Sequence, residues 1–426
     1  MLLDLAELKR LVAGGAVAIR GTATLEPAGG PGDKIFPPTH AVDDKNKKPG
    51  AKYAFETRRI AGQDITCVLI DSVQSQANRM EEALQALWDD KRIALPVVSV
   101  DFSTIAPEVG RVTSLTAPHR IADALLRDSL FNGQLFRLSD VGKSFTDAST
   151  KNATALFKVC PTGLVFGLWD STGPKGGLGA KFQRALVSEI VGINAVAGSK
   201  TQCRIDPAQM VNAAAVLYRK ARTSGESLTW TADEAEAERG RVGKEENVAL
   251  KWGAKWKGGA WTQGDGKVTT ANHSNIPPTI DAVGGGVTID EARHTVVLSL
   301  ASLRRLGFDT GAEESRTVLA ALGLLAVLGA ENRGHDLRSR CLLVPKKGSA
   351  LGLESVARDG STTPIELDFD AAIALYNAAV AALPDQVKFA KAAGKALAEL
   401  TPSPKLADLV RRSHELVKAG AEVGDE

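Results

Sequence analysis

The stretch ITCVLIDSVQSQANRMEEALQALW, residues 65–88, contains the sharpest change of pattern in the chain. Its first six residues form a short apolar run that is typical of a buried strand. After residue 72 the apolar side chains Met80, Leu84 and Leu87 recur at helical spacing and share one face. A strand that runs directly into an amphipathic helix is a building unit of α/β and α+β proteins.

The same alternation of strands and helices continues on both sides of this stretch. Further strands are predicted over residues 16–25, 97–102, 163–169, 294–300 and 341–345. Further helices are predicted over residues 2–12, 116–126, 182–190, 210–222, 318–330, 369–383, 387–400 and 405–418. No fixed-period repeat is visible. The pattern predicts a mixed α and β fold with large insertions, and we treat residues 1–426 as one elaborated unit.

Three segments depart from the regular pattern. Residues 26–60 are rich in Gly, Pro, Lys and Asp, which indicates a loop or surface insertion. Residues 225–290 are polar and Gly-rich and hold four of the six tryptophans, which indicates an inserted β-ribbon. Residues 364–426 are rich in Ala with apolar positions at helical spacing, which predicts a helical tail.

The charge balance and the cysteines exclude several classes of protein. The 426 residues include 52 Lys and Arg and 50 Asp and Glu, a net charge of +2, which excludes a histone-like polycation. The four cysteines are far apart with no CxxC pair, so no zinc motif is visible. The N-terminus lacks a basic region before its apolar residues, and the longest apolar run, residues 318–330, is too short for a bilayer. These features predict a soluble cytoplasmic protein.

Motifs of catalysis are missing from the sequence. It contains no HExxH, no GxSxG and no clustered carboxylates of metal-binding type, so we expect no catalytic residue, metal ligand or cofactor. His119 and His273 lie in polar surroundings that suit a base but more often hold a hydrogen-bonding surface histidine. Asp71, at the end of a predicted strand, is either a catalytic carboxylate or a helix N-cap.

A glycine-rich basic segment, STGPKGGLGAKFQR at residues 171–184, is the strongest binding signal. It fails the Walker A pattern, because Ala180 precedes the lysine and Phe182 replaces the magnesium-binding Ser or Thr. Glycines nevertheless let backbone N–H groups approach an anion, and a following helix N-terminus would add a favourable dipole. Residues 171–204 contain five basic residues and one acidic residue, which favours a phosphate-binding patch over a tight turn with solvated lysines.

Two further segments carry weaker signals. The block at residues 71–79 places six donor side chains where a strand meets a helix, more than capping requires. The tryptophans of residues 225–290 either stack on splayed bases, contact a neighbouring subunit, or form a small core for the insertion.

Five long motifs resemble the backbone subunit of the type I-G (formerly I-U) CRISPR Cascade complex, a member of the RAMP superfamily. They are LIDSVQSQANRMEEAL (69–84), TSLTAPHRIADALLRDS (113–129), FGLWDSTGPKGGLGAKFQRALVSEIVG (166–192), HSNIPPT (273–279) and GGVTIDEARHTVVLSLASLRRLGF (285–308). The resemblance covers residues 69–308 and leaves the first sixty residues and the tail unassigned.

The resemblance implies an α+β fold with a modified RRM (ferredoxin-like) palm, inserted finger and thumb elements and a helical tail. It implies that copies stack head to tail along a guide RNA, which pairs with target DNA, in a complex with other Cascade subunits. In such complexes the protein holds RNA by its phosphates and shape while base pairing supplies specificity. On this basis the expected RNA-binding residues are Arg20, Ser72, Gln74, Ser75, Gln76, Asn78, Arg79, His119, Arg120, Lys175, Gly176, Gly177, Lys181 and Arg184. The expected thumb or subunit contacts are Trp252, Trp256, Trp261, His273 and Asn275.

Two other functions remain open at this point. Some RAMP relatives cut RNA with a single loop aspartate, and Asp71, Asp101 and Asp170 are the candidates for a metal-dependent endoribonuclease. A phosphate-binding small-molecule enzyme could instead use the glycine-rich segment.

Overall fold

The computed structural model describes residues 1–170, 180–222, 228–389 and 394–418. It divides into two compact units. The first comprises Met1–Gly198 and Val283–Leu406, and the second comprises Ser199–Ala282 and the C-terminal segment that begins at Ala407. The second unit therefore contains most of the segment predicted as an insertion, 225–290, and begins earlier in the chain. Among the described residues, no helix has both the length and the apolar character that crossing a bilayer requires.

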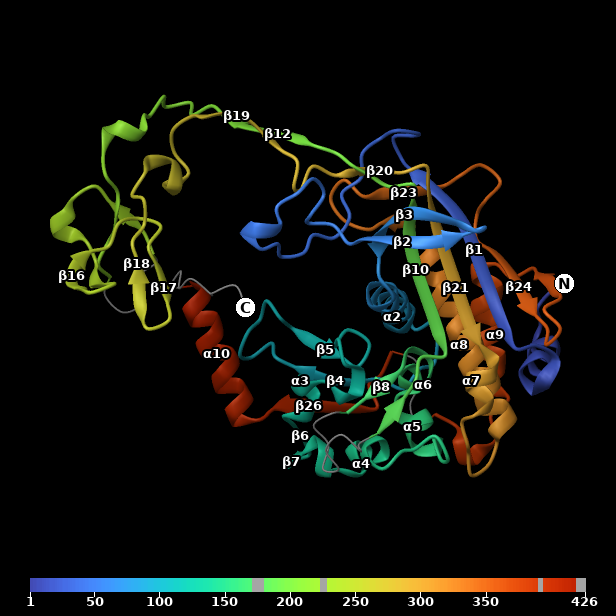
Figure 1. Ribbon diagram of the computed structural model, residues 1–426. Coiled ribbons are helices and arrows are strands. Elements are labelled where there is room, and N and C mark those ends of the chain that lie inside the picture. Colours follow the sequence, from blue (N-terminus) through green and yellow to red (C-terminus); the bar gives the residue numbers. More distant parts are fainter. Residues whose placement is uncertain (171–179, 223–227, 390–393, 419–426) are drawn as a thin grey trace. The chain divides into compact units, whose positions relative to one another are not determined.

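A nine-stranded sheet forms the centre of the first unit (Figure 1). Its path is β2-β3-β10-β21-β1-β23-β22, with β24 pairing β1 and β25 pairing β24, and every pairing is antiparallel. The strands are β1 (Ala18–Pro27), β2 (Phe55–Ile60), β3 (Gln63–Asp71), β10 (Leu186–Ile193), β21 (Glu291–Ser299), β22 (His335–Asp336), β23 (Leu342–Pro345), β24 (Gly352–Val356) and β25 (Thr362–Ile365).

Side chains alternate between the two faces of this sheet. On β1, Ile19 and Leu25 are buried while Arg20 and Thr22 are exposed. One face is therefore apolar and packs on helices, as expected for an antiparallel sheet with one solvated face. The helices that pack on the sheet are α2 (Val73–Asp89), α7 (Leu300–Arg304) and α8 (Ala312–Asn332). Two more, α1 (Leu5–Arg10) with its continuation Leu11–Gly15 and α9 (Phe369–Ala381), pack on α8.

Helix α2 begins where the sequence predicts it. Ser72 is the N-cap, and its side chain accepts a hydrogen bond from the backbone N–H of Ser75. The helix packs on β10 and on α8, where an added Cβ at Gly329 would lie 3.2 Å from the Cβ of Ala83. This close approach fixes α2 against α8, and α8 in turn packs on β21 and α9.

A smaller five-stranded sheet completes the first unit. Its order is β5-β4-β26-β6-β7, with β4 (Val98–Asp101), β5 (Arg111–Thr113), β6 (Ser129–Phe131), β7 (Gln134–Leu135) and β26 (Ala398–Pro402). Short helices surround it: α3 (Ala124–Arg127), α4 (Asp140–Thr146), α5 (Thr154–Val159) and α6 (Pro161–Phe166). Two short strand pairs are β8 (Leu168–Trp169) with β9 (Lys181–Phe182), and β11 (Val196–Ala197) with β20 (Val287–Thr288).

The second unit consists of short strands around a small apolar cluster. The strands pair as β12 (Lys200–Arg204) with β19 (Ile276–Asp281), and β13 (Tyr218–Arg219) with β14 (Trp230–Thr231). A four-stranded sheet has the order β16-β15-β18-β17, from β16 (Glu245–Ala249), β15 (Arg239–Val242), β18 (Ala260–Thr262) and β17 (Lys255–Lys257). Leu217, Leu250, Ala254 and Val268 are buried in this unit. The last helix is α10 (Pro404–Lys418).

Several of the predicted elements are wrong. Residues 163–169 are mostly the helix α6, and the predicted helix 182–190 consists of β9 and the first half of β10. Spacings of four residues fit both periods, and on β10 Leu186, Ser188 and Ile190 are buried together on one strand face. The predicted helix 210–222 contains only a 3₁₀ turn, Asn212–Ala214, and β13.

Two more predicted helices are absent. The helix predicted over residues 116–126 is reduced to a 3₁₀ turn, Arg120–Ala122, and α3. Between residues 387 and 400 the described part of the tail forms β26, which pairs in parallel with β4, so the tail is not purely helical. The parallel partner is 300 residues away in the chain, and local spacing carries no sign of it.

The core of α8 supplies a test of this arrangement. Leu322 is fully buried, and truncation of a buried leucine costs the transfer free energy and leaves a cavity. We expect Leu322→Ala to lower the free energy of unfolding by about 2–5 kcal/mol in denaturant titrations. Leu409→Ala, at a position 62% exposed on α10, should change it by less than about 0.5 kcal/mol. Equal effects would contradict the burial of α8.

Candidate nucleic-acid interface

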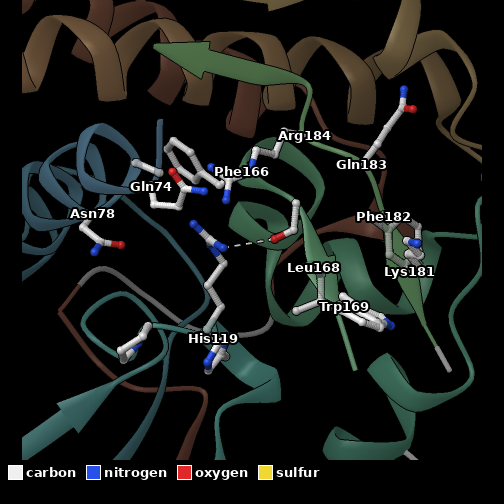
Figure 2. A pocket seen from close by; sticks show the side chains of 14 residues that line it. Gln74, Asn78, His119, Phe166, Leu168, Trp169, Lys181, Phe182, Gln183 and Arg184 are labelled. Carbon is white, nitrogen blue, oxygen red and sulfur yellow. Dashed lines mark hydrogen bonds between the residues drawn. The ribbon is translucent and has the colours of Figure 1, made fainter. Parts of the chain in front are cut away.

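A cavity of about 510 Å³ lies in the first unit, between α2 and the β8–β9 pair. Four chain segments far apart in the sequence line it: the exposed side of α2, residues 118–120, residues 166–169, and residues 181–184. Figure 2 shows Gln74 and Asn78 on one wall, His119 below, and Trp169 and Lys181 on the opposite wall. The fold therefore brings together parts of three motifs that the sequence analysis quoted separately.

The α2 wall presents uncharged polar groups. Gln74 and Asn78 are four residues apart on the helix, so they share one face, and both are exposed to the cavity. His119 is also exposed, and its backbone N–H donates to Asp123 at 3.2 Å, which holds its chain segment in place. Amide and imidazole groups of this kind hydrogen-bond equally well to phosphate oxygens and to sugar hydroxyls.

The charge of the lining is positive. Among the described residues that line the cavity, none is acidic, whereas Lys181 and Arg184 are cations. Arg184 donates from Nη1 to the carbonyl of Val73 at 3.3 Å and forms no ion pair with any described residue. Burial and then the neighbouring cation of Arg120 lower the pKa of the Arg184 guanidinium. An anion in the cavity would relieve this repulsion.

An exposed indole adjoins the cations. Trp169 on β8 is 57% exposed, and its partner across the β8–β9 pair is Lys181. The Lys181 ammonium lies 5.4 Å from the centre of the indole ring. An exposed aromatic face beside a cation is the pairing that proteins use to stack a base while they neutralise its phosphate. Trp169 was not among the predicted binding residues, although its place in the motif at residues 166–192, beside a basic segment, was a usable signal.

Arg120 supports the wall of the cavity. Its Nε and Nη2 donate to the two carboxylate oxygens of Glu81, both at 2.7 Å, and its Nη1 donates to the carbonyl of Gly167 at 3.1 Å. Both members of the pair are buried, and burial raises the pKa of Glu81 to about 7 although Arg120 opposes this shift. Gly167 has φ +88°, and an added Cβ there would lie 2.9 Å from the Cγ of Arg184.

Some side chains of the polar block at residues 71–79 face the cavity, and others face the protein interior. Asp71 is fully buried and accepts hydrogen bonds from Ser75 Oγ at 2.8 Å, Gln76 Nε2 at 2.7 Å and Arg79 Nε at 3.0 Å. Arg338 Nη2 adds a fourth at 3.0 Å. Ser75, Gln76 and Arg79 therefore serve this carboxylate, and Ser72 serves as the helix cap. Asp71 itself is not the N-cap.

Several other predicted site residues do not line this cavity. Arg20 on β1 pairs with Glu354, to which its Nε donates at 2.7 Å. Lys175, Gly176 and Gly177 lie outside the described residues. The helix dipole expected at the end of the glycine-rich segment is absent, because β9 and not a helix follows that segment.

The predicted thumb residues lie in the second unit. The Trp252 indole N–H donates to the carbonyl of Thr270 at 3.1 Å, and Trp261 packs beneath Arg219, whose guanidinium carbon is 4.6 Å from the ring centre. Trp256 meets Trp261 edge-on at 5.5 Å and is 59% exposed.

The remaining two thumb residues make contacts within the same unit. His273 contacts Trp230 edge-on at 5.9 Å. The Asn275 side-chain oxygen accepts a hydrogen bond from the backbone N–H of Asp206 at 2.7 Å. Most of the predicted thumb set is thus engaged in holding the second unit together, and Trp256 and Asn275 are its exposed members.

The other two candidate catalytic aspartates differ from each other. Asp170 is buried and pairs with Arg137 Nη2 at 2.5 Å. Asp101 is exposed at the end of β4, where the hydroxyl and then the backbone N–H of Ser103 lower the pKa of its carboxyl. Neither lines the cavity.

The described residues that line the cavity combine cations, amides and an exposed indole and include no carboxylate, which is the chemistry that suits a polyanion such as nucleic acid. Residues 19–197, which are less than half of the chain, match the family described as CRISPR-associated protein GSU0053. The CRISPR resemblance is thereby confirmed.

Two further comparisons complete these findings. A solved structure described as Thermofilum pendens Csc2 is similar with 12% identity and a TM-score of 0.26, over 99% of this chain and 94% of that chain. The comparison with curated proteins gives no match.

The Arg120–Glu81 pair gives a prediction that distinguishes residues that stabilise the cavity wall from residues that are exposed to a ligand. Removing one partner of a buried ion pair leaves an uncompensated charge. We expect Arg120→Ala to lower the free energy of unfolding by about 3–5 kcal/mol in denaturant titrations. Lys181→Ala, on the exposed side of the same cavity, should change it by less than about 0.5 kcal/mol. A small effect of Arg120→Ala would show that the pair does not hold the wall.

Proposed function

We propose that the chain is the multi-copy backbone subunit of a type I-G CRISPR Cascade complex and that the cavity between α2 and β8–β9 binds the guide RNA. One observation carries the proposal: in a chain that matches a CRISPR-associated family over residues 19–197, the cavity combines cations, amides and an exposed indole, and no described lining residue is acidic. The whole chain has a net charge of only +2, yet the cavity lining carries the cations Lys181 and Arg184.

The order of the strands supports an RRM-like palm. The four adjacent strands β24-β1-β21-β10 are antiparallel. In chain order they are β1, β10, β21 and β24, with α2 between the first two and α8 between the last two. This succession of strand, helix, two strands, helix and strand is that of a ferredoxin-like fold. On this view the second unit is inserted between β10 and β21, the hairpin of the palm.

Each lining group has a role in the proposed complex. Lys181 and Arg184 neutralise guide phosphates, Trp169 stacks on one base, and Gln74, Asn78 and His119 hydrogen-bond to phosphates or sugars. None of these contacts reads a base edge, so guide sequence is free to vary and pairing with target DNA supplies specificity. Copies of the chain and other Cascade subunits are the protein partners.

The proposed subunit has no catalytic role. Of the three aspartates that a RAMP endoribonuclease could use, Asp71 and Asp170 are buried in ion pairs with arginines. Incubation with magnesium and labelled RNA tests this directly. Cleavage that Asp101→Ala abolishes would favour the endoribonuclease, and binding that free ATP saturates but RNA does not would favour a small-molecule enzyme.

The salt dependence of RNA binding tests the cavity. Each cation that neutralises a phosphate of a single strand contributes about −0.7 to the slope of log affinity against log salt. We expect Lys181→Ala and Arg184→Ala each to flatten the slope by about 0.7, and the double variant by about 1.4. The measurement is fluorescence anisotropy with two unrelated guides at several salt concentrations, and both guides should be affected alike.

A matched variant controls for surface charge. Lys388 is exposed and pairs with Asp385 at 2.6 Å, outside the cavity, so Lys388→Ala should leave the slope unchanged. An unchanged slope in the double variant would show that the cavity cations do not meet phosphates. Loss of binding to one guide only would indicate base recognition instead.

Assembly is tested in the second unit. Head-to-tail association is heterologous and gives an open helix, so it needs an exposed surface. We expect Trp256→Ala to reduce the size of the particle formed with guide RNA and partner proteins while leaving the melting temperature nearly unchanged. Trp261→Ala should lower the melting temperature, because its ring packs on Arg219. Sedimentation and thermal unfolding distinguish the two, and an RNA-independent dimer would argue against the filament.

A further inference from the structure

Three side chains converge inside the first unit, away from the RNA cavity. His294 lies on β21, Glu331 in the last turn of α8, and His335 on β22. His294 Nδ1 is 3.2 Å from Glu331 Oε1, and His335 Nε2 is 3.4 Å from Glu331 Oε2. Both histidines are buried, at 3% and 6% exposure, and one ligand atom from each of the three residues lies within 4.8 Å of the others.

A chain of hydrogen bonds fixes the proton on His294. Gln76 donates from Nε2 to the buried carboxylate of Asp71, so its Oε1 is an acceptor. Ser188 Oγ donates to that oxygen at 2.8 Å. The hydroxyl proton is then used, and Ser188 can only accept from His294 Nε2, which lies 2.8 Å away. His294 therefore carries its proton on Nε2.

The other ring nitrogen is left with a bare lone pair. In the neutral ring His294 Nδ1 is an acceptor, and it is buried without a hydrogen-bond partner among the described residues. It faces the Glu331 carboxylate, which also offers only lone pairs. Two groups of acceptors held this close inside a protein need a positive charge between them, which is either a proton or a metal ion.

We propose that His294 Nδ1, His335 Nε2 and the carboxylate of Glu331 bind one zinc ion. Zinc bonds of about 2.0–2.2 Å in a tetrahedron separate neighbouring ligand atoms by about 3.3–3.5 Å. The two nitrogen–oxygen distances, 3.2 and 3.4 Å, are close to this spacing but end on different oxygens of Glu331, so the carboxylate would supply both oxygens or turn to supply one. One ligand atom from each residue already lies within 4.8 Å of the others. If the lone pair of His294 Nδ1 points at a metal position between the three residues, it does not point at Glu331 Oε1. This explains why the two atoms are 3.2 Å apart and yet form no hydrogen bond.

The ligand types select the metal. Two imidazoles and a carboxylate suit zinc and its transition-metal neighbours, whereas magnesium and calcium prefer oxygen ligands alone. The Ser188 hydroxyl is the outer partner that orients a ligating histidine. Bound zinc would tie β21 to the end of α8 and to β22, so its role is structural. The sequence predicted no metal site because His294 is distant in the chain from Glu331 and His335, so the three residues form no local motif.

The full-length chain, freed of any histidine tag, tests the proposal. We expect about one zinc per chain by elemental mass spectrometry, and rebinding by the chelator-treated protein in competition with a chromophoric chelator. Cobalt(II) in its place should give the intense visible absorption of a four-coordinate site. Glu331→Gln keeps the shape but removes the charged ligand, and it should abolish stoichiometric zinc. Ser188→Ala retains all three ligands and should weaken zinc binding by about 10–100-fold.

A control and two outcomes complete the test. His40 is exposed and distant in the chain, so His40→Ala should retain one zinc. A wild-type chain that takes up no zinc or cobalt while folded by circular dichroism would overturn the proposal in favour of a proton-bridged cluster. Retention of zinc by Glu331→Gln would overturn it equally. If that variant fails to fold, the wild-type stoichiometry and the cobalt spectrum still decide.

Discussion

The buried carboxylate of Asp71 is the interaction on which the functional part of the first unit depends. It lies where β3 ends and accepts hydrogen bonds from three side chains of α2 and from Arg338. A buried charge with fewer donors would be costly, so the chain must place all four. The first turns of α2 are thereby held in one rotation about the helix axis. That rotation directs Gln74 and Asn78 to the cavity.

A second buried charge fixes the opposite wall in the same way. Glu81, two turns further along α2, binds Arg120 through both oxygens, and Arg120 also binds the carbonyl of Gly167. Arg120 therefore attaches its own segment and the segment that contains Gly167 to the helix α2. Lys181 and Arg184 remain without an acidic partner among the described residues, so their charge is available to a ligand. The carboxylates neutralise the supporting arginines and leave the binding cations free.

The sequence predicts those elements in which one period dominates. The strand and helix of residues 65–88, the apolar helix α8 and the strands β1 and β21 are confirmed. The prediction failed at residues 182–190, where four-residue spacing is compatible with both helix and strand, and at β26, whose partner strand is distant in the chain. The family resemblance was confirmed over residues 19–197. The motifs at residues 273–279 and 285–308 lie beyond the match.

The candidate site was predicted only in part, for a definite physical reason. Gln74, Asn78, His119, Lys181 and Arg184 were selected from three separate motifs, and the fold brings them to one cavity. Their role in RNA binding stays a prediction. Other selected donors, such as Gln76 and Arg120, proved to be partners of buried carboxylates. Donor side chains in a motif do not show which will face inward, because that depends on acceptors supplied by the packed fold.

The Asp71 network also connects two features that are separate in the sequence. The side-chain N–H of Gln76 donates to Asp71, so the Gln76 oxygen accepts from the Ser188 hydroxyl. The Ser188 oxygen must then accept from His294 Nε2. One buried charge at the end of β3 thus sets the orientation of α2 and the tautomer of a histidine on β21. A metal ion bound at His294 needs an unprotonated Nδ1, and the hydrogen-bond network already places the ring proton on Nε2. Metal binding would therefore stabilise the tautomer that the network imposes. The same hydrogen bonds would then hold both the wall of the proposed RNA-binding cavity and the proposed metal site.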